Sequence, residues 1–77
     1  MGNKLYVGNL SRETTEEDLR ELFSAVGPVT SVSIPPDAKT GARQNFGLVE
    51  METAEGTLAA IKSVNGKSLH GRALKVT

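Results

Sequence analysis

Two short apolar segments constrain this chain most, because Leu5–Leu10 and Gln44–Met51 each alternate as a half-buried β-strand does. Alternate residues of a strand point to opposite faces of the sheet. In each segment an aromatic residue, Tyr6 or Phe46, falls on the same face as polar or glycine residues and not on the face of the Leu and Val residues. If the two strands lie side by side, both rings project from the sheet face that turns away from the core. Stacking against nucleic acid bases would give two rings a physical reason to face water.

The composition is typical of one small domain, which we expect to span residues 1–77. The chain has no cysteine, and this excludes disulfides and thiolate metal sites. No apolar run approaches the ~20 residues of a membrane span, and the amino terminus enters a strand almost at once instead of forming a signal peptide. We therefore expect a monomer that is intracellular, cytoplasmic or nuclear, and neither secreted nor membrane-bound.

The charges of the chain are balanced overall but unevenly placed. Nine basic and nine acidic residues cancel, whereas dedicated nucleic-acid binders usually have a basic excess. Residues 1–26 hold three basic against five acidic residues, and residues 27–77 hold six against four. The uneven distribution leaves room for a locally basic face on a neutral protein.

Periodicity and capping signals predict two helices. Thr15 is a hydroxyl cap followed by acidic residues in the first turn, which the helix dipole favours. The apolar face of this helix follows the spacing i, i+3, i+4, i+7 and consists of Leu19, Leu22, Phe23 and Val26. Gly27-Pro28 ends the helix. Thr53 is predicted to cap a second helix of about ten residues, and Asn65-Gly66 is a strong turn signal after it.

The predicted strands complete a βαββαβ order, and they span Lys4–Gly8, Val29–Ile34, Gln44–Met51 and Arg72–Val76. We therefore expect an α+β, ferredoxin-like two-layer sandwich in which two helices cover one face of a four-stranded antiparallel sheet. The helix-facing row comprises Leu5, Val7, Val32, Ile34, Val49, Met51, Leu74 and Val76. The open row comprises Lys4, Tyr6, Ser33, Gln44, Phe46, Leu48, Glu50, Ala73 and Lys75.

At this point the residues resemble a known family. Leu5-Tyr6-Val7-Gly8-Asn9-Leu10 matches the hexapeptide of the RNA recognition motif, and Asn45-Phe46-Gly47-Leu48-Val49-Glu50-Met51 matches its octapeptide without the first residue. The resemblance covers the chain essentially from end to end. It implies a single-domain ribonucleoprotein module that binds roughly two to four nucleotides of single-stranded RNA across the open sheet face.

The octapeptide departs from the family pattern at two positions that bear on binding. Gln44 stands where the family has a basic residue that contacts phosphate, and it brings no charge. Leu48 stands where the family has a second stacking aromatic residue, and it offers contact area without a π-face. Both changes imply weak binding.

The candidate RNA-binding residues are the two rings and their neighbours. Tyr6 and Phe46 are assigned to stacking, and Leu48 is an apolar filler beside them. The polar and basic candidates are Lys4, Asn9, Arg43, Gln44, Arg72 and Lys75. Two alternatives stay open here, because Asn9 either ends its strand or binds a base, and charges at strand edges are often only solvated. His70 is interpreted as a turn residue.

Magnitudes limit the affinity that this set of residues predicts. Stacking contributes ~1–3 kcal/mol per base, so two rings give roughly 2–6 kcal/mol. Association costs an estimated ~4–15 kcal/mol. Binding should therefore be micromolar or weaker, with a salt dependence no steeper than about −4 on a log–log plot.

Two other functions compete with RNA binding. A protein-interaction module on the same fold is favoured by the neutral charge, by the altered octapeptide and by Leu58, which falls outside the inward row of the second helix. An enzyme is poorly supported, because the sequence has no Ser/His/Asp set, paired carboxylates, phosphate loop or metal cluster. We therefore expect no catalytic residue, metal or cofactor. Single-stranded DNA is a further expected ligand, since stacking does not read the 2′-hydroxyl.

Overall fold

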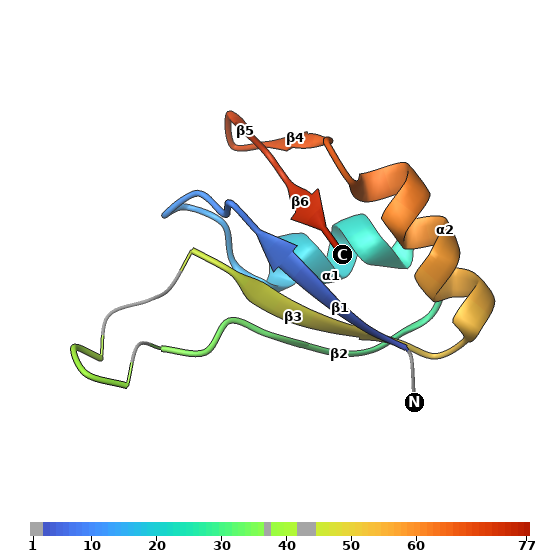
Figure 1. The fold of residues 1–77 in the computed structure, drawn as a ribbon, viewed down its shortest axis with the longest axis horizontal. Helices are drawn as coiled ribbons and strands as arrows, with labels where there is room; N and C mark the ends of the chain where they lie inside the picture. Colours follow the sequence, from blue (N-terminus) through green and yellow to red (C-terminus); the bar gives the residue numbers. More distant parts are fainter. Residues whose placement is uncertain (1–2, 37, 42–44) are drawn as a thin grey trace.

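The centre of the fold is an antiparallel pair of strands, seen in a computed structural model that describes residues 3–36, 38–41 and 45–77. Strand β1 (Lys4–Gly8) pairs with β3 (Gly47–Met51), with Leu5 opposite Val49 and Tyr6 opposite Leu48. The outer strands are β2 (Val29–Ser33), which pairs with β3, and β6 (Lys75–Val76), which pairs with β1. In the described part of the chain the sheet therefore has four strands in the order β2-β3-β1-β6 (Figure 1).

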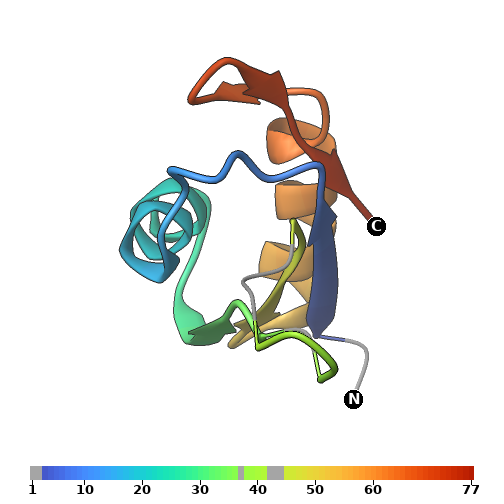
Figure 2. The ribbon, with the colours of Figure 1, turned by 90° about the vertical axis from the view of Figure 1, so that its left-hand side faces the viewer.

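Two helices cover one face of this sheet. Helix α1 (Glu16–Ser24) buries Leu19 and Phe23, and helix α2 (Ala54–Val64) buries Ala60 and Val64. In Figure 2 both helices lie on the same side of β1. They pack against Leu74 and against alternate residues of the sheet strands. The sheet residues in the core are Leu5, Val7, Val32, Val49, Met51 and Val76. The predicted α+β two-layer fold is confirmed, and the opposite face of the sheet, called the open face below, is left uncovered by helices.

The carboxyl-terminal segment differs from the single strand expected over Arg72–Val76. It is divided into β5 (Arg72–Ala73), which forms a hairpin with β4 (Ser68–Leu69), and β6, which joins the main sheet. Between them the backbone of Leu74 donates to the carbonyl of Lys67 at 2.9 Å and accepts from the N–H of Gly66 at 2.7 Å. The chain therefore changes its pairing partner at Leu74, whose side chain is buried.

Other element boundaries shift by a few residues. Strand β3 begins at Gly47, so Phe46 precedes it, and the predicted start at Gln44 lies outside the described residues. Helix α1 ends at Ser24 because the N–H groups of Val26 and Gly27 both donate to the carbonyl of Phe23, which tightens the last turn. Ile34, expected in the helix-facing row, is only half-buried.

The amino terminus of α1 is fixed by reciprocal hydrogen bonds. Thr15 Oγ1 accepts from the backbone N–H of Asp18 at 3.0 Å, and Asp18 Oδ2 accepts from the backbone N–H of Thr15 at 3.0 Å. These bonds satisfy donors that the first turn of a helix leaves unpaired. The hydroxyl cap predicted from the sequence is thus a complete capping box.

His70 connects this capping box to the β4–β5 hairpin. The residue lies at the hairpin turn with a φ of 52°, and its Nε2 donates to Asp18 Oδ2 at 2.9 Å. The hydrogen bonds from His70 and from the Thr15 N–H hold the pKa of Asp18 below its ordinary value of 3.8. His70 is therefore a turn residue that also fastens the hairpin to α1.

The lowered pKa of Asp18 predicts an acid-sensitive contribution to stability. A carboxylate whose folded-state pKa lies below its unfolded value stabilises fully above pH 3.8 and loses this contribution as the pH falls through the folded-state pKa. We expect the free energy of unfolding, measured by urea denaturation, to fall more steeply in this acid range for the wild type than for Asp18→Asn. Glu21→Gln, which removes an exposed carboxylate of the same helix, is the control. Equal acid sensitivity of the wild type and Asp18→Asn would contradict this role of Asp18.

Candidate nucleic-acid interface

Two aromatic rings lie together on the open face. The ring centroids of Tyr6 and Phe46 are 5.2 Å apart, and the ring planes differ by 20°, which is a stacked arrangement. Tyr6 is 46% exposed and Phe46 is half-buried. The structure thus places both rings on the side of the sheet predicted from their parity. At this separation the stacking is offset, so each ring covers part of one face of the other and leaves its outer face available to a ligand.

Leu48 extends this apolar surface along β3. It lies directly opposite Tyr6 in the strand register and is 41% exposed. Tyr6, Phe46 and Leu48 together form what we call the open-face patch. Leu58, the other exposed large apolar residue in the described part of the chain, belongs to helix α2 on the opposite side of the sheet.

The basic candidates differ in their surroundings. Lys4 lies opposite Glu50 in the register of β1 and β3, so a carboxylate shares its part of the open face. Lys75 lies opposite Gly8, which brings no charge, and its side chain is exposed. Lys75 is therefore the less compensated cation beside the rings. Arg43 and Gln44 lie outside the described residues.

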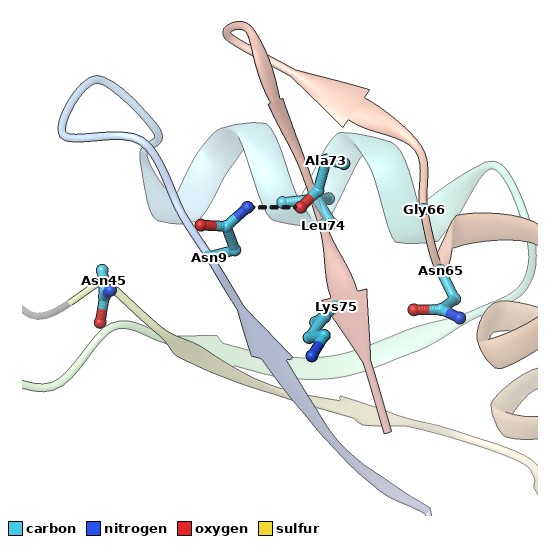
Figure 3. A pocket seen from close by; sticks show the side chains of 7 residues that line it. All are labelled: Asn9, Asn45, Asn65, Gly66, Ala73, Leu74 and Lys75. Carbon is cyan, nitrogen blue, oxygen red and sulfur yellow. Dashed lines mark hydrogen bonds between the residues drawn. The ribbon is translucent and has the colours of Figure 1, made fainter.

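Asn9 and Arg72 are joined to each other. Asn9 Nδ2 donates to the carbonyl of Ala73 at 2.7 Å (Figure 3). Asn9 Oδ1 accepts from Arg72 Nε at 3.2 Å and from Arg72 Nη2 at 2.6 Å. Both ends of the amide are thus occupied in holding the end of β1 to β5. This arrangement favours strand termination over base contact for Asn9, and it fixes the Arg72 guanidinium beside the end of β1.

A shallow groove of about 570 Å³ adjoins the end of β1 (Figure 3). Its lining residues are Asn9, Asn45, Asn65, Gly66, Ala73, Leu74 and Lys75. The amide of Asn65 accepts the N–H of Val76 through Oδ1 at 3.0 Å, which leaves its Nδ2 as a donor. Asn65 was predicted only as part of a turn, and Asn45 only as a residue of the strand over Gln44–Met51, so neither was among the residues expected to contact RNA.

Other kinds of site find little support in the described part of the chain. Within residues 3–36, 38–41 and 45–77, no group of three His, Cys, Asp or Glu side chains is placed to hold a metal ion. Among the same residues, no helix combines the length and apolar character needed to cross a bilayer.

The sequence profile of the RNA recognition motif matches residues 5–75. This chain belongs to the RNA recognition motif family. The protein RbpE of Nostoc sp., which is named for RNA binding, is 47% identical over 72 residues, or 94% of this chain and 73% of RbpE. Human cleavage stimulation factor subunit 2 is 42% identical over 72 residues, which are 94% of this chain but only 12% of that protein.

Solved structures agree with this assignment. The structure of the Rna15 RNA recognition motif with bound RNA (GU) superposes with a TM-score of 0.85 at 30% identity, and the match covers 100% of this chain and 82% of that one. The open face described above is therefore the sheet surface of an RNA recognition motif.

The conformation of Asn9 gives a stability prediction. Its φ of 63° lies in the left-handed region, which disfavours most side chains but is tolerated by asparagine and glycine. Asn9→Ala loses the amide contacts and strains the backbone, so we expect its free energy of unfolding to fall by about 1–3 kcal/mol. Asn9→Gly loses the contacts alone and should be about 1 kcal/mol more stable than Asn9→Ala. Equal urea stability of the two variants would exclude a conformational role.

Proposed function

We propose that this chain is a non-enzymatic module that binds single-stranded RNA on its open face. The observation that carries the proposal is the stacked pair of exposed Tyr6 and half-buried Phe46, on the sheet face that neither helix covers. Membership of the RNA recognition motif family and the RNA-bound Rna15 structure support this class of ligand. Large exposed rings on a sheet are otherwise unfavourable, and contact with a base would remove them from water.

The geometry of the ring pair suggests how bases bind. Phe46 stacks on one face of Tyr6, and the other face of the Tyr6 ring can stack one base. The outer face of Phe46 and the side chain of Leu48 supply contact area for the neighbouring nucleotide. Because the two rings stack on each other, the face that each turns to the other is less available to a base. This limits the stacking energy of the pair, and the affinity for RNA stays in the micromolar range or weaker.

Basic and polar groups around the patch supply the remaining contacts. Lys75 lies on β6 opposite Gly8, and Arg72 lies on β5 with its guanidinium bonded to Asn9, so both are candidates for phosphate contacts. Lys4 contributes less because Glu50 lies opposite it. Arg43 and Gln44 stay predictions from the family pattern.

Removal of either ring tests the proposal directly. We expect Tyr6→Ala and Phe46→Ala each to weaken binding of a fluorescein-labelled RNA hexamer by roughly 5- to 150-fold, as the loss of ~1–3 kcal/mol of stacking requires. Fluorescence anisotropy at low salt measures the affinity, with hexamers of each base, an alternating GU hexamer and the matching DNA strands.

Leu58→Ala is the matched control, because it removes a comparably exposed apolar side chain from the helical side. Its affinity should equal that of the wild type. Binding that survives both ring variants would refute stacking on the open face. Binding of DNA within a few-fold of RNA would show that the 2′-hydroxyl is not read.

The charge distribution predicts a shallow salt dependence. Single-stranded nucleic acid releases about 0.7 counterions per neutralised phosphate, so Lys4, Arg43, Arg72 and Lys75 together give a log–log slope of about −3 at most. Titrations between 25 and 200 mM salt, taken as roughly the accessible range for weak binding, measure this slope. Arg72→Ala should make the slope shallower by about 0.7. A slope steeper than about −4 would show that further cations bind phosphate.

A protein-interaction module is the alternative outcome of the same titrations. If no RNA or DNA oligomer binds, the exposed patch and Leu58 become candidate contacts for a protein partner. A monomeric state and an intracellular location, cytoplasmic or nuclear, complete the proposal, since they suit a small module that meets RNA in the cell.

A further inference from the structure

Gly8 stands beside the ring pair without a conformational reason to be glycine. It lies in β1, and its φ is not positive. Among the described glycines, a positive φ occurs at Gly41, Gly66 and Gly71. Glycine inside a strand is unfavourable because it loses more conformational freedom than other residues and has no side chain to pack. The position therefore needs an explanation from its surroundings.

The nearest side chain to the empty Cβ position of Gly8 is that of Tyr6. An ideal Cβ on Gly8 would lie 3.0 Å from Cε1 of Tyr6 and 3.6 Å from its Cζ and Oη, and these are the three nearest atoms. Carbon atoms in contact normally stay about 3.5–4.0 Å apart. The Tyr6 ring thus lies over the backbone of Gly8, in the space that any other residue would fill with its own side chain.

This placement of the ring creates the stack with Phe46. Val7 lies opposite Gly47, so Gly8 stands beside Phe46 at the end of the β1–β3 pair. By leaning over Gly8 along its own strand, Tyr6 brings its ring to 5.2 Å from the ring of Phe46. On the other side of Gly8 lies Lys75, which lines the groove of Figure 3.

We infer that Gly8 is a positioning residue whose missing side chain sets the orientation of Tyr6 and thereby the ring face offered to a base. A side chain at this position would begin 3.0 Å from the Tyr6 ring, so the ring would have to shift from its present place beside Phe46. The inference rests on the proposed RNA binding for its functional part. Its structural part concerns the two rings alone and holds without RNA.

The test combines Gly8→Ala with a double-mutant cycle. We expect Gly8→Ala to weaken binding of an RNA hexamer by about fivefold or more, because stacking is impaired. In the Tyr6→Ala background the same substitution should change the affinity by less than about twofold, because the residue it displaces is gone. An effect of equal size in both backgrounds would overturn the inference, since Gly8 would then act through something other than Tyr6.

Aromatic NMR spectra of the RNA-free protein supply a second readout. The wild type should show contacts between the ring protons of Tyr6 and Phe46, and Gly8→Ala should lose them and shift the Phe46 ring signals. Retention of these contacts in Gly8→Ala would overturn the inference regardless of RNA. If the wild type binds no oligomer, the proposed function fails, and these spectra alone decide the role of Gly8.

Two further variants separate positioning from stability. Gly27→Ala is the matched control, because a Cβ there would meet Gly56 Cα at 3.5 Å and Met51 Cε at 3.6 Å, both ordinary contacts. It should leave the ring contacts and the affinity unchanged. If Gly8→Ala unfolds more easily, the Tyr6→Ala/Gly8→Ala variant should recover urea resistance relative to Gly8→Ala. Failure to recover would show that Gly8 is required for the strand and not for the ring.

Discussion

The antiparallel pairing of β1 with β3 is the interaction on which both the core and the interface depend. Because side chains alternate along a strand, the register that places Leu5 opposite Val49 toward the helices also places Tyr6 opposite Leu48 toward solvent. A slip of one residue would exchange the two sets and bury the rings. The hydrophobic effect that holds the helices against the sheet therefore also specifies which residues face solvent on the open face.

Much of this arrangement was predictable from the sequence because it follows from local periodicity. A period of two separates the two faces of each strand, and the spacing of Leu19 and Phe23 identifies the buried face of α1. The hydroxyl cap at Thr15 and the turn at Asn65-Gly66 follow equally from residue type and position. The parity of Tyr6 and Phe46 then places the two rings on the same face without any knowledge of distant contacts.

Contacts between residues far apart in the sequence have no such local signal. Asn9 and Arg72 were separate candidates, and only the fold shows that the amide of one holds the guanidinium of the other. His70 and Asp18 meet in the same way. The mutual stacking of the rings depends on a side chain being absent at Gly8, and a missing side chain leaves no periodic pattern. Sequence position likewise does not tell that Glu50 lies opposite Lys4 across the two strands.

The change of pairing partner at Leu74 divides the carboxyl-terminal segment into two parts. Strands β4 and β5 pair with each other, and His70 between them bonds to Asp18 at the start of α1. Of the strands in this segment, only β6 joins the main sheet. Leu74 is fixed from both sides, by its buried side chain and by its bonds to Gly66 and Lys67. Extra residues inserted between Leu69 and Arg72 would therefore lengthen a surface loop and leave the register of β6 unchanged. The hairpin tip is thus a place where the domain can acquire new sequence while Tyr6, Phe46 and Leu48 keep their places on the main sheet.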